Sequence, residues 1–121
     1  MSPRRGGRAS ARGGPTARAA RQAIEDRDLE GLLALIRVDA EITDAANHRT
    51  GGALVAQVLL DVLPPVDSSA RVSAQSVNGR EGLIFRCGER VIAIAVLRTR
   101  GRRIAEVWLV EDPARLRDWN R

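Results

Sequence analysis

Two side chains that could exchange a proton lie four residues apart in the sequence. Asp44 stands at the end of an expected strand, and His48, the only histidine, follows it in the loop before a long apolar helix. A carboxylate beside an imidazole can orient the ring and raise its pKa, an arrangement suited to general acid–base catalysis. If the chain is an enzyme, Asp44 and His48 are its predicted catalytic residues. The alternative is that Asp44 caps the loop and His48 is simply exposed to solvent.

The rest of the sequence supplies few further groups for catalysis or metal binding. Cys87 is the only cysteine, so neither an internal disulfide nor a cysteine-based zinc site can form. It lies in the apolar run LIFRCG, where a structural thiol is expected. One histidine and scattered acids give no metal-ligand spacing, so we predict no metal and no cofactor. Catalysis is therefore less well supported than binding.

Two tryptophans are candidates for packing or for binding. Trp108, within the run EVWLV, could line a cavity, although a lone strand tryptophan more often packs in a core. Trp119 could pack the last helix on the sheet or contact a partner. Four polar side chains on the expected strands could also line a pocket, but their side of the sheet depends on the register. They are Gln75, Arg86, Arg98 and Glu106.

Charge divides the chain into a basic arm and a nearly neutral body. The formal net charge is +5, and residues 1–21 hold six arginines and no acid. The remaining 14 arginines against 15 acids leave the rest of the chain at about −1. A nearly neutral body lacks the broad positive face of a duplex-binding protein, so we expect nucleic acid to bind only weakly, through the arm. Few aromatic residues remain for stacking single-stranded bases.

The choice of basic residue indicates the genome rather than the function. All 20 basic residues are arginine and none is lysine, which is typical of a GC-rich genome such as that of an actinobacterium. The N-terminal arginines are not followed by an apolar segment, and no run approaches a membrane span. The sequence predicts a soluble cytoplasmic protein that does not interact with membranes.

The hydrophobic pattern predicts one α+β domain after a disordered arm. Residues 1–17 are rich in Arg and Gly without periodicity, and residues 18–121 are expected to form the domain. Two helices are predicted first, the second capped by Asp28 and running through LEGLLALI. The run RVDAEITDA then reads as a strand, AANHRTGG as a loop, and ALVAQVLLDVL as a helix that Pro64-Pro65 ends.

The second half of the sequence reads as a β-meander. Four strands are predicted, ARVSAQSV, GLIFRCG, RVIAIAVLRT and RIAEVWLVE, with Asn78-Gly79 as a tight turn between the first two. Their short connections favour antiparallel pairing. A last short helix is predicted over DPARLRDW, with Asp112 as its cap and Pro113 at its first position.

This order of elements resembles the SnoaL-like branch of the nuclear transport factor 2-like superfamily. More narrowly, three stretches are similar to the C-terminal SnoaL-like domain of actinobacterial extracytoplasmic-function sigma factors. The VNG and GLI around residues 77–84 resemble that group's VNG-x-PG hairpin, DPARL at 112–116 resembles its terminal NPDKL, and DLEGLLALI with AEITD resembles its first helix and strand. The resemblance implies a cone-shaped, cystatin-like fold whose curved antiparallel sheet packs on the N-terminal helices.

The sequence departs from that group at three places. The group's Asp-Gly-Gly-Gly loop aligns with residues 44–47, of which only the acid remains. Glu81 stands where proline is usual, and Glu111-Asp112 replaces the asparagine before Pro113. The DNA-binding and polymerase-binding helices of a sigma factor do not precede the domain here. We therefore expect either a detached regulatory domain or a fragment of a longer sigma factor.

The resemblance implies a non-catalytic domain that modulates transcription initiation by binding a protein or a small molecule. The implied partners are a sigma factor core or RNA polymerase, a small hydrophobic ligand, and a second copy packed through the exposed sheet face. The alternative is a small SnoaL-like isomerase, cyclase or hydrolase that acts on a hydrophobic metabolite. The positions carried over as contacts, with Trp108 added as a candidate lining residue, are Asp44, Asn78, Gly79, Asp112, Pro113 and Leu116.

Overall fold

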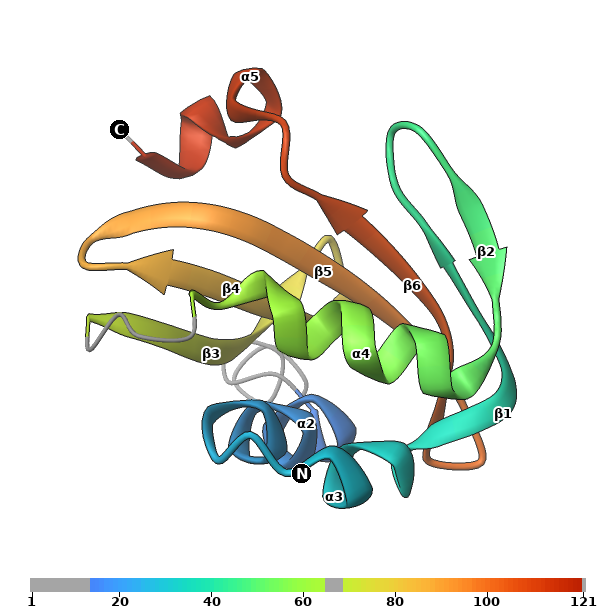
Figure 1. The fold of residues 1–121 in the computed structure, drawn as a ribbon. Coiled ribbons are helices and arrows are strands. Elements are labelled where there is room, and N and C mark those ends of the chain that lie inside the picture. The colour runs from blue at the N-terminus through green and yellow to red at the C-terminus, as the bar shows by residue number, and fades with distance from the viewer. Residues whose placement is uncertain (1–13, 65–68, 121) are drawn as a thin grey trace, which may run out of the picture.

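The computed structural model describes residues 14–64 and 69–120 of the chain (Figure 1). The helices are α2 (Pro15–Glu25), α3 (Leu29–Leu33), α4 (Gly52–Val62), α5 (Pro113–Leu116) and the 3-10 helix η1 (Arg117–Asn120). The strands are β1 (Ile36–Thr43), β2 (His48–Thr50), β3 (Ala70–Val77), β4 (Arg80–Cys87), β5 (Arg90–Arg100) and β6 (Arg103–Val110). The boundary predicted between residues 17 and 18 falls within α2, and the rest of the predicted arm lies outside the described residues.

Helix α2 is held by partners from the sheet at both of its ends. Its first residue is Pro15, whose fixed φ suits the first turn. The Glu81 Oε1 atom of β4 accepts a hydrogen bond from the Ala17 N–H at 2.7 Å, which places an anion at the helix N-terminus. At the other end, Glu25 Oε2 accepts a hydrogen bond from the Val72 N–H of β3 at 2.9 Å. Glu81 therefore serves as a cap for α2.

Helix α3 begins as predicted but ends earlier. The Asp28 carboxylate accepts a hydrogen bond from the Gly31 N–H at 2.9 Å, which confirms the predicted cap. The helix was expected to continue through Ile36, and this is wrong. Ile36 is 4% exposed and starts β1, where it pairs with Ile104 of β6. The β-branched side chain is thus buried in the sheet rather than in the helix.

The six strands form one curved, unclosed sheet in the order β2-β1-β6-β5-β4-β3. Strands β3 to β6 pair with one another in antiparallel fashion, as predicted for the meander. Strand β1 runs parallel to β6, so the sheet is mixed rather than wholly antiparallel. This parallel pairing places β1, the first strand in the chain, beside β6, the last one. Helix α4 lies in the part of the chain that connects these two strands. The segment His48–Thr50, expected as a loop, forms β2 against β1.

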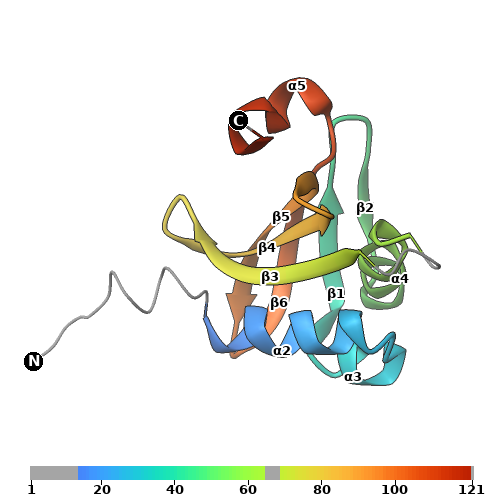
Figure 2. The ribbon, with the colours of Figure 1, turned by 90° about the vertical axis from the view of Figure 1, so that its left-hand side faces the viewer.

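The inner face of the sheet packs on the helices. Helices α2, α3 and α4 lie along this face, while the C-terminal segment lies on the other side of the sheet (Figures 1 and 2). Phe85, Leu83 and Val107 of the sheet and Leu59 of α4 are at most 1% exposed and belong to this core. Gly52 lets α4 approach β1 closely, since a Cβ there would lie 2.5 Å from the Arg37 carbonyl oxygen.

The outer face carries a smaller apolar cluster under the C-terminal segment. Leu116 of α5 is 3% exposed and packs with Val77, Ile84, Val91 and Ile94. The predicted start of α5 is confirmed, because Pro113 is its first residue and Asp112 Oδ1 accepts a hydrogen bond from the Ala114 N–H at 3.0 Å. The outer face is therefore partly covered rather than fully exposed.

None of the helices in the described ranges is long and apolar enough to span a membrane.

Candidate functional site

Asp44 follows the last residue of β1 and caps the loop between β1 and β2. Its Oδ1 atom accepts hydrogen bonds from the N–H groups of Ala46 at 2.9 Å and Asn47 at 2.8 Å. These two donors, with a smaller contribution from the nearby Arg49 guanidinium, lower the pKa of the Asp44 carboxyl below its usual value. The group is thus held as a carboxylate and is poorly suited to donate a proton.

His48 has a different partner from Asp44. Its Nε2 atom lies 2.6 Å from Glu41 Oε1, and its side chain is 55% exposed. In the β1–β2 ladder His48 lies opposite Thr43, whereas Arg49 lies opposite the buried Ile42. Because side chains alternate along a strand, His48 faces outward and Arg49 inward. The predicted acid–base pair is therefore not brought together as a hydrogen-bonded pair in the part of the chain that the structure describes.

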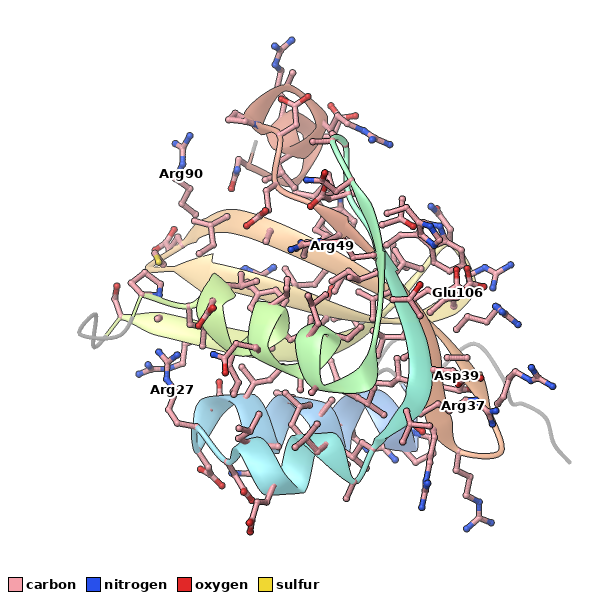
Figure 3. The ribbon with its side chains drawn as sticks, turned by 45° about the vertical axis from the view of Figure 1, so that its right-hand side comes forward. Arg27, Arg37, Asp39, Arg49, Arg90 and Glu106 are labelled. Carbon is pink, nitrogen blue, oxygen red and sulfur yellow. The ribbon has the colours of Figure 1, made fainter. Side chains whose placement is uncertain are left out.

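Arg49 is an inward-facing polar side chain that was not predicted from the sequence. Figure 3 shows it pointing from β2 toward the space above α4. Its Nη2 atom lies 3.8 Å from Asp44 Oδ2, while its buried Nε has no hydrogen-bond partner among the described residues. Side-chain alternation predicts an inward-facing Arg49 only if residues 48–50 are predicted to form a strand.

A hollow of about 290 Å³ lies where β1 and β6 end side by side. The carboxyl ends of parallel strands meet at one edge, so Asp44 and Asp112 come together there although they are far apart in the sequence. Arg115 of α5 also lines this hollow. Within residues 14–64 and 69–120, no group of histidine, cysteine and acidic side chains could hold a metal ion. Two of the predicted contact positions, Asp44 and Asp112, thus share one small hollow.

A larger groove of about 570 Å³ lies on the outer face of the sheet. It contains two more of the predicted positions, Asn78 and Trp108, which come from the β3–β4 turn and from β6. Trp108 faces outward because it lies opposite Val96, on the face that carries Ile94. The residues that line the groove are Val77, Asn78, Arg80, Ile94, Val96, Trp108, Val110, Arg115 and Trp119.

Aromatic and basic side chains meet in this groove. Both tryptophans of the sequence line it, and the only other aromatic residue, Phe85, is fully buried in the inner core. The Arg80 guanidinium carbon lies 5.8 Å from the centroid of the Trp108 ring, within the range of a cation–π contact. Neither Arg80 nor Arg115 forms an ion pair with any described residue. These two arginines were not predicted, since their place depends on the strand register and on how α5 docks.

Three other predicted positions, Gly79, Pro113 and Leu116, shape the groove without lining it. Leu116 is buried between α5 and the outer face of the sheet, so it anchors the segment that carries Arg115 and Trp119. Asn78 and Gly79 have φ values of 53° and 80°, which confirms the predicted tight turn. Pro113 is exposed at the start of α5. These residues set the two walls between which the groove lies.

The four polar strand residues proposed as pocket lining lie outside both hollows. Arg98 forms a short ion pair with Glu106 across β5 and β6. Arg86 donates a hydrogen bond to the Ser73 hydroxyl at 3.1 Å. Gln75 lies opposite Gly82 on the outer face. None of these four residues lines either described hollow.

A curved α+β sheet with helices packed inside it is an architecture shared with many solved structures. A protein with a cystatin-like fold from Silicibacter pomeroyi DSS-3 is 21% identical, with a TM-score of 0.61 over 86% of this chain and 81% of that chain. An NTF2-like protein from Cytophaga hutchinsonii ATCC 33406 is 11% identical, with a TM-score of 0.58 over 84% of this chain and 90% of that chain. An LEH-like epoxide hydrolase from M. tuberculosis is 13% identical, with a TM-score of 0.51 over 82% and 81% of the two chains.

These similarities confirm the predicted fold class: the chain has the cystatin-like, nuclear transport factor 2-like α+β fold. No protein-family model matches the sequence, and no curated protein sequence is significantly similar to it. At such low identities the similarity establishes the fold alone.

Proposed function

We propose that this chain is a non-catalytic binding domain whose outer groove receives a ligand or a segment of a partner protein. The observation that carries the proposal is the convergence in the groove of both tryptophans with two arginines that form no ion pair with any described residue. A concave, mostly apolar site with a few directed polar groups is the usual form of a binding site. The side chains come from four separate segments, so the folded domain is needed to assemble them.

The surroundings of Asp44 and His48 support binding over catalysis. The Asp44 carboxylate accepts hydrogen bonds from two backbone N–H groups. His48 lies within hydrogen-bond distance of Glu41 on the outer face of the strands. A general acid needs a pKa near the working pH, whereas the pKa of Asp44 is lowered. The two side chains most suited to proton transfer are thus engaged in a loop cap and in a contact with Glu41.

The domain's role is in transcription regulation, through contact with a sigma factor core or RNA polymerase. What supports this part of the proposal is the sequence resemblance of residues 77–84 and 112–116 to sigma-factor domains. Asn78 lines the outer groove and Asp112 lines the adjoining hollow, so one surface contains both stretches. A second copy of the chain is a further candidate partner for this surface.

Binding to purified RNA polymerase and to an isolated sigma factor core tests this role. We expect the wild-type chain to bind one of them and the variant Trp108→Ser to bind at least tenfold more weakly, as expected for loss of a central interface tryptophan. The variant Arg103→Gln, an exposed arginine outside the groove, is the matched control. Absence of binding to both partners would overturn the regulatory role while leaving a small-molecule role open.

The second candidate is a small enzyme that acts on a hydrophobic metabolite. The structural similarities support this alternative better than they support a sigma-factor role, because one similar structure is that of an LEH-like epoxide hydrolase. Within this chain Arg49 points inward and its buried Nε has no hydrogen-bond partner among the described residues, so Arg49 is the candidate for polarising a substrate on the inner side. An apolar cyclic epoxide is the first substrate class to assay.

Turnover of that substrate separates the two candidates. An enzyme would show turnover that falls at least tenfold in Arg49→Met and remains unchanged in Trp108→Ser. If the wild-type chain and Arg49→Met give the same background rate, the enzyme candidate is rejected for this substrate class.

A further inference from the structure

We infer that the occupant of the outer groove is a small, flat, apolar molecule with one carboxylate, such as an aromatic or polycyclic acid. The inference rests on the proposed binding function and names the chemical class of the ligand. It is drawn from the size of the groove, the side chains of its floor and walls, and its charge.

The size and floor of the groove suit an apolar molecule. Its volume of about 570 Å³ falls within the range of roughly 300 to 1,000 Å³ that is typical for small-molecule sites. Val77, Ile94, Val96 and Val110 provide the apolar floor. A ligand that covers these side chains removes apolar surface from water, which supplies the main driving force for binding.

The aromatic groups favour a flat ligand. Trp119 is 39% exposed, so its ring has surface free to stack on a planar molecule. Trp108 has its ring next to the Arg80 guanidinium, which is itself planar and can stack. A planar ligand therefore meets two indole rings and a flat cation in one groove.

The charge of the groove favours an anion. Two arginines line it, while none of its described lining residues is acidic. Three acids, Asp44, Glu111 and Asp112, line the neighbouring hollow instead, which Arg115 also borders, whereas Arg80 lines only the groove. Guanidinium groups bind carboxylates with two parallel hydrogen bonds, so one carboxylate can pair with Arg80 or Arg115.

The walls of the groove favour a small molecule over a flat protein surface. Figure 2 shows the β3–β4 hairpin and the C-terminal segment both standing out from the outer side of the sheet. Their residues Asn78 and Trp119 line the groove. A second copy with its own curved outer face would meet these walls before it reached the apolar floor.

The test uses 2-naphthoate and its neutral counterpart 2-naphthamide. Binding is measured by calorimetry, and the two tryptophan indole N–H signals in ¹⁵N NMR spectra report the site, because the chain has no others. We expect naphthoate to shift both indole signals and to bind at least tenfold more tightly than naphthamide. That ratio corresponds to one charge-assisted hydrogen-bonded pair.

Variants assign the charge recognition to the groove. Arg80→Gln or Arg115→Gln is expected to weaken naphthoate binding about tenfold or more and to weaken naphthamide binding much less, because only the carboxylate loses a charge-assisted partner. Arg103→Gln is the control and should bind both compounds like the wild type. Thermal unfolding of every variant checks that the fold is retained.

Four other results would each contradict the inference in a different way. Equal affinity for the two compounds, with both arginine variants unaffected, would overturn carboxylate recognition and leave the binding groove in place. Indole signals that move with protein concentration alone would show that a second copy occupies the groove. Tighter binding of an acidic peptide than of naphthoate would show a protein segment as the occupant. If no compound moves either signal, both the ligand class and the groove as a small-molecule site are rejected.

Discussion

The side chain of Asn120 completes the sheet where β6 ends. The Val91 N–H donates to Asn120 Oδ1 at 2.6 Å, and Asn120 Nδ2 donates to the Val91 carbonyl oxygen at 3.0 Å. Strand β6 ends at Val110, which lies opposite Ile94 of β5. Val91 therefore extends beyond the last residue of β6, and the Asn120 carboxamide takes the place of the missing strand.

Replacing Asn120 by leucine should lower the free energy of unfolding. The change removes both hydrogen bonds, and each is worth about 0.5 to 1.5 kcal/mol net, so we expect a loss of about 1 to 3 kcal/mol. The Val91 groups are left without partners at a part-buried position, which favours the upper half of that range. For a domain of this size the melting temperature should fall by about 4 °C or more per kcal/mol.

Urea denaturation followed by circular dichroism measures this loss, and hydrogen exchange of the Val91 amide locates it. The amide should exchange much faster in Asn120→Leu than in the wild type. Arg117→Ala, a change at an exposed residue of the same 3-10 helix, should stay within about 0.5 kcal/mol of the wild type. Unchanged stability together with a Val91 amide that is still protected would refute this account of how the C-terminal segment is held.

Three further variants test other parts of the structure. Leu116→Ala should lower the free energy of unfolding by about 2 to 4 kcal/mol, because it leaves a cavity in the outer cluster; a loss below about 1 kcal/mol in urea denaturation would contradict that packing. Gly79→Val should cost about 1 to 3 kcal/mol, because a β-branched residue is forced to a φ of 80°; thermal unfolding measures it, and Gly79→Asn, which tolerates this φ better, should cost less. Asp44→Ala should reduce stability at neutral pH, and the difference from wild type should shrink as the pH falls. The folded-state pKa of Asp44 is lowered, so its contribution is present above the unfolded-state value and is lost as the pH falls through the folded-state value; a pH-independent difference in urea denaturation would argue against an ionised cap.

Features determined by neighbouring residues were predictable from the sequence. The Asn78-Gly79 turn, the Asp28 cap and the start of α5 at Pro113 each depend on the local backbone preference of a few residues, and the structure confirms all three. The antiparallel meander of β3 to β6 follows in the same way from short connections. The fold class could therefore be predicted from these local features and from the order of the elements along the chain.

The candidate site was only partly predictable because it depends on distant pairings. Trp108 and Asn78 were chosen, but the Arg80 that stacks on Trp108 was not, since the contact depends on the register across three strands. Nothing in the run HRT distinguished a short edge strand from a loop. Without that distinction, the sequence could not show that His48 faces out and Arg49 faces in.

The hydrogen bond between Glu25 of α2 and Val72 also bears on aggregation. Strand β3 is the last strand of the sheet, and the exposed edge of such a strand can pair with a strand of another molecule. The Glu25 carboxylate occupies the Val72 N–H of this edge and is itself paired with Arg21 at 2.8 Å. An incoming strand would have to displace this ion pair before it could form a ladder with β3. Helix α2 thus blocks strand addition at this position of the β3 edge, in addition to closing the core.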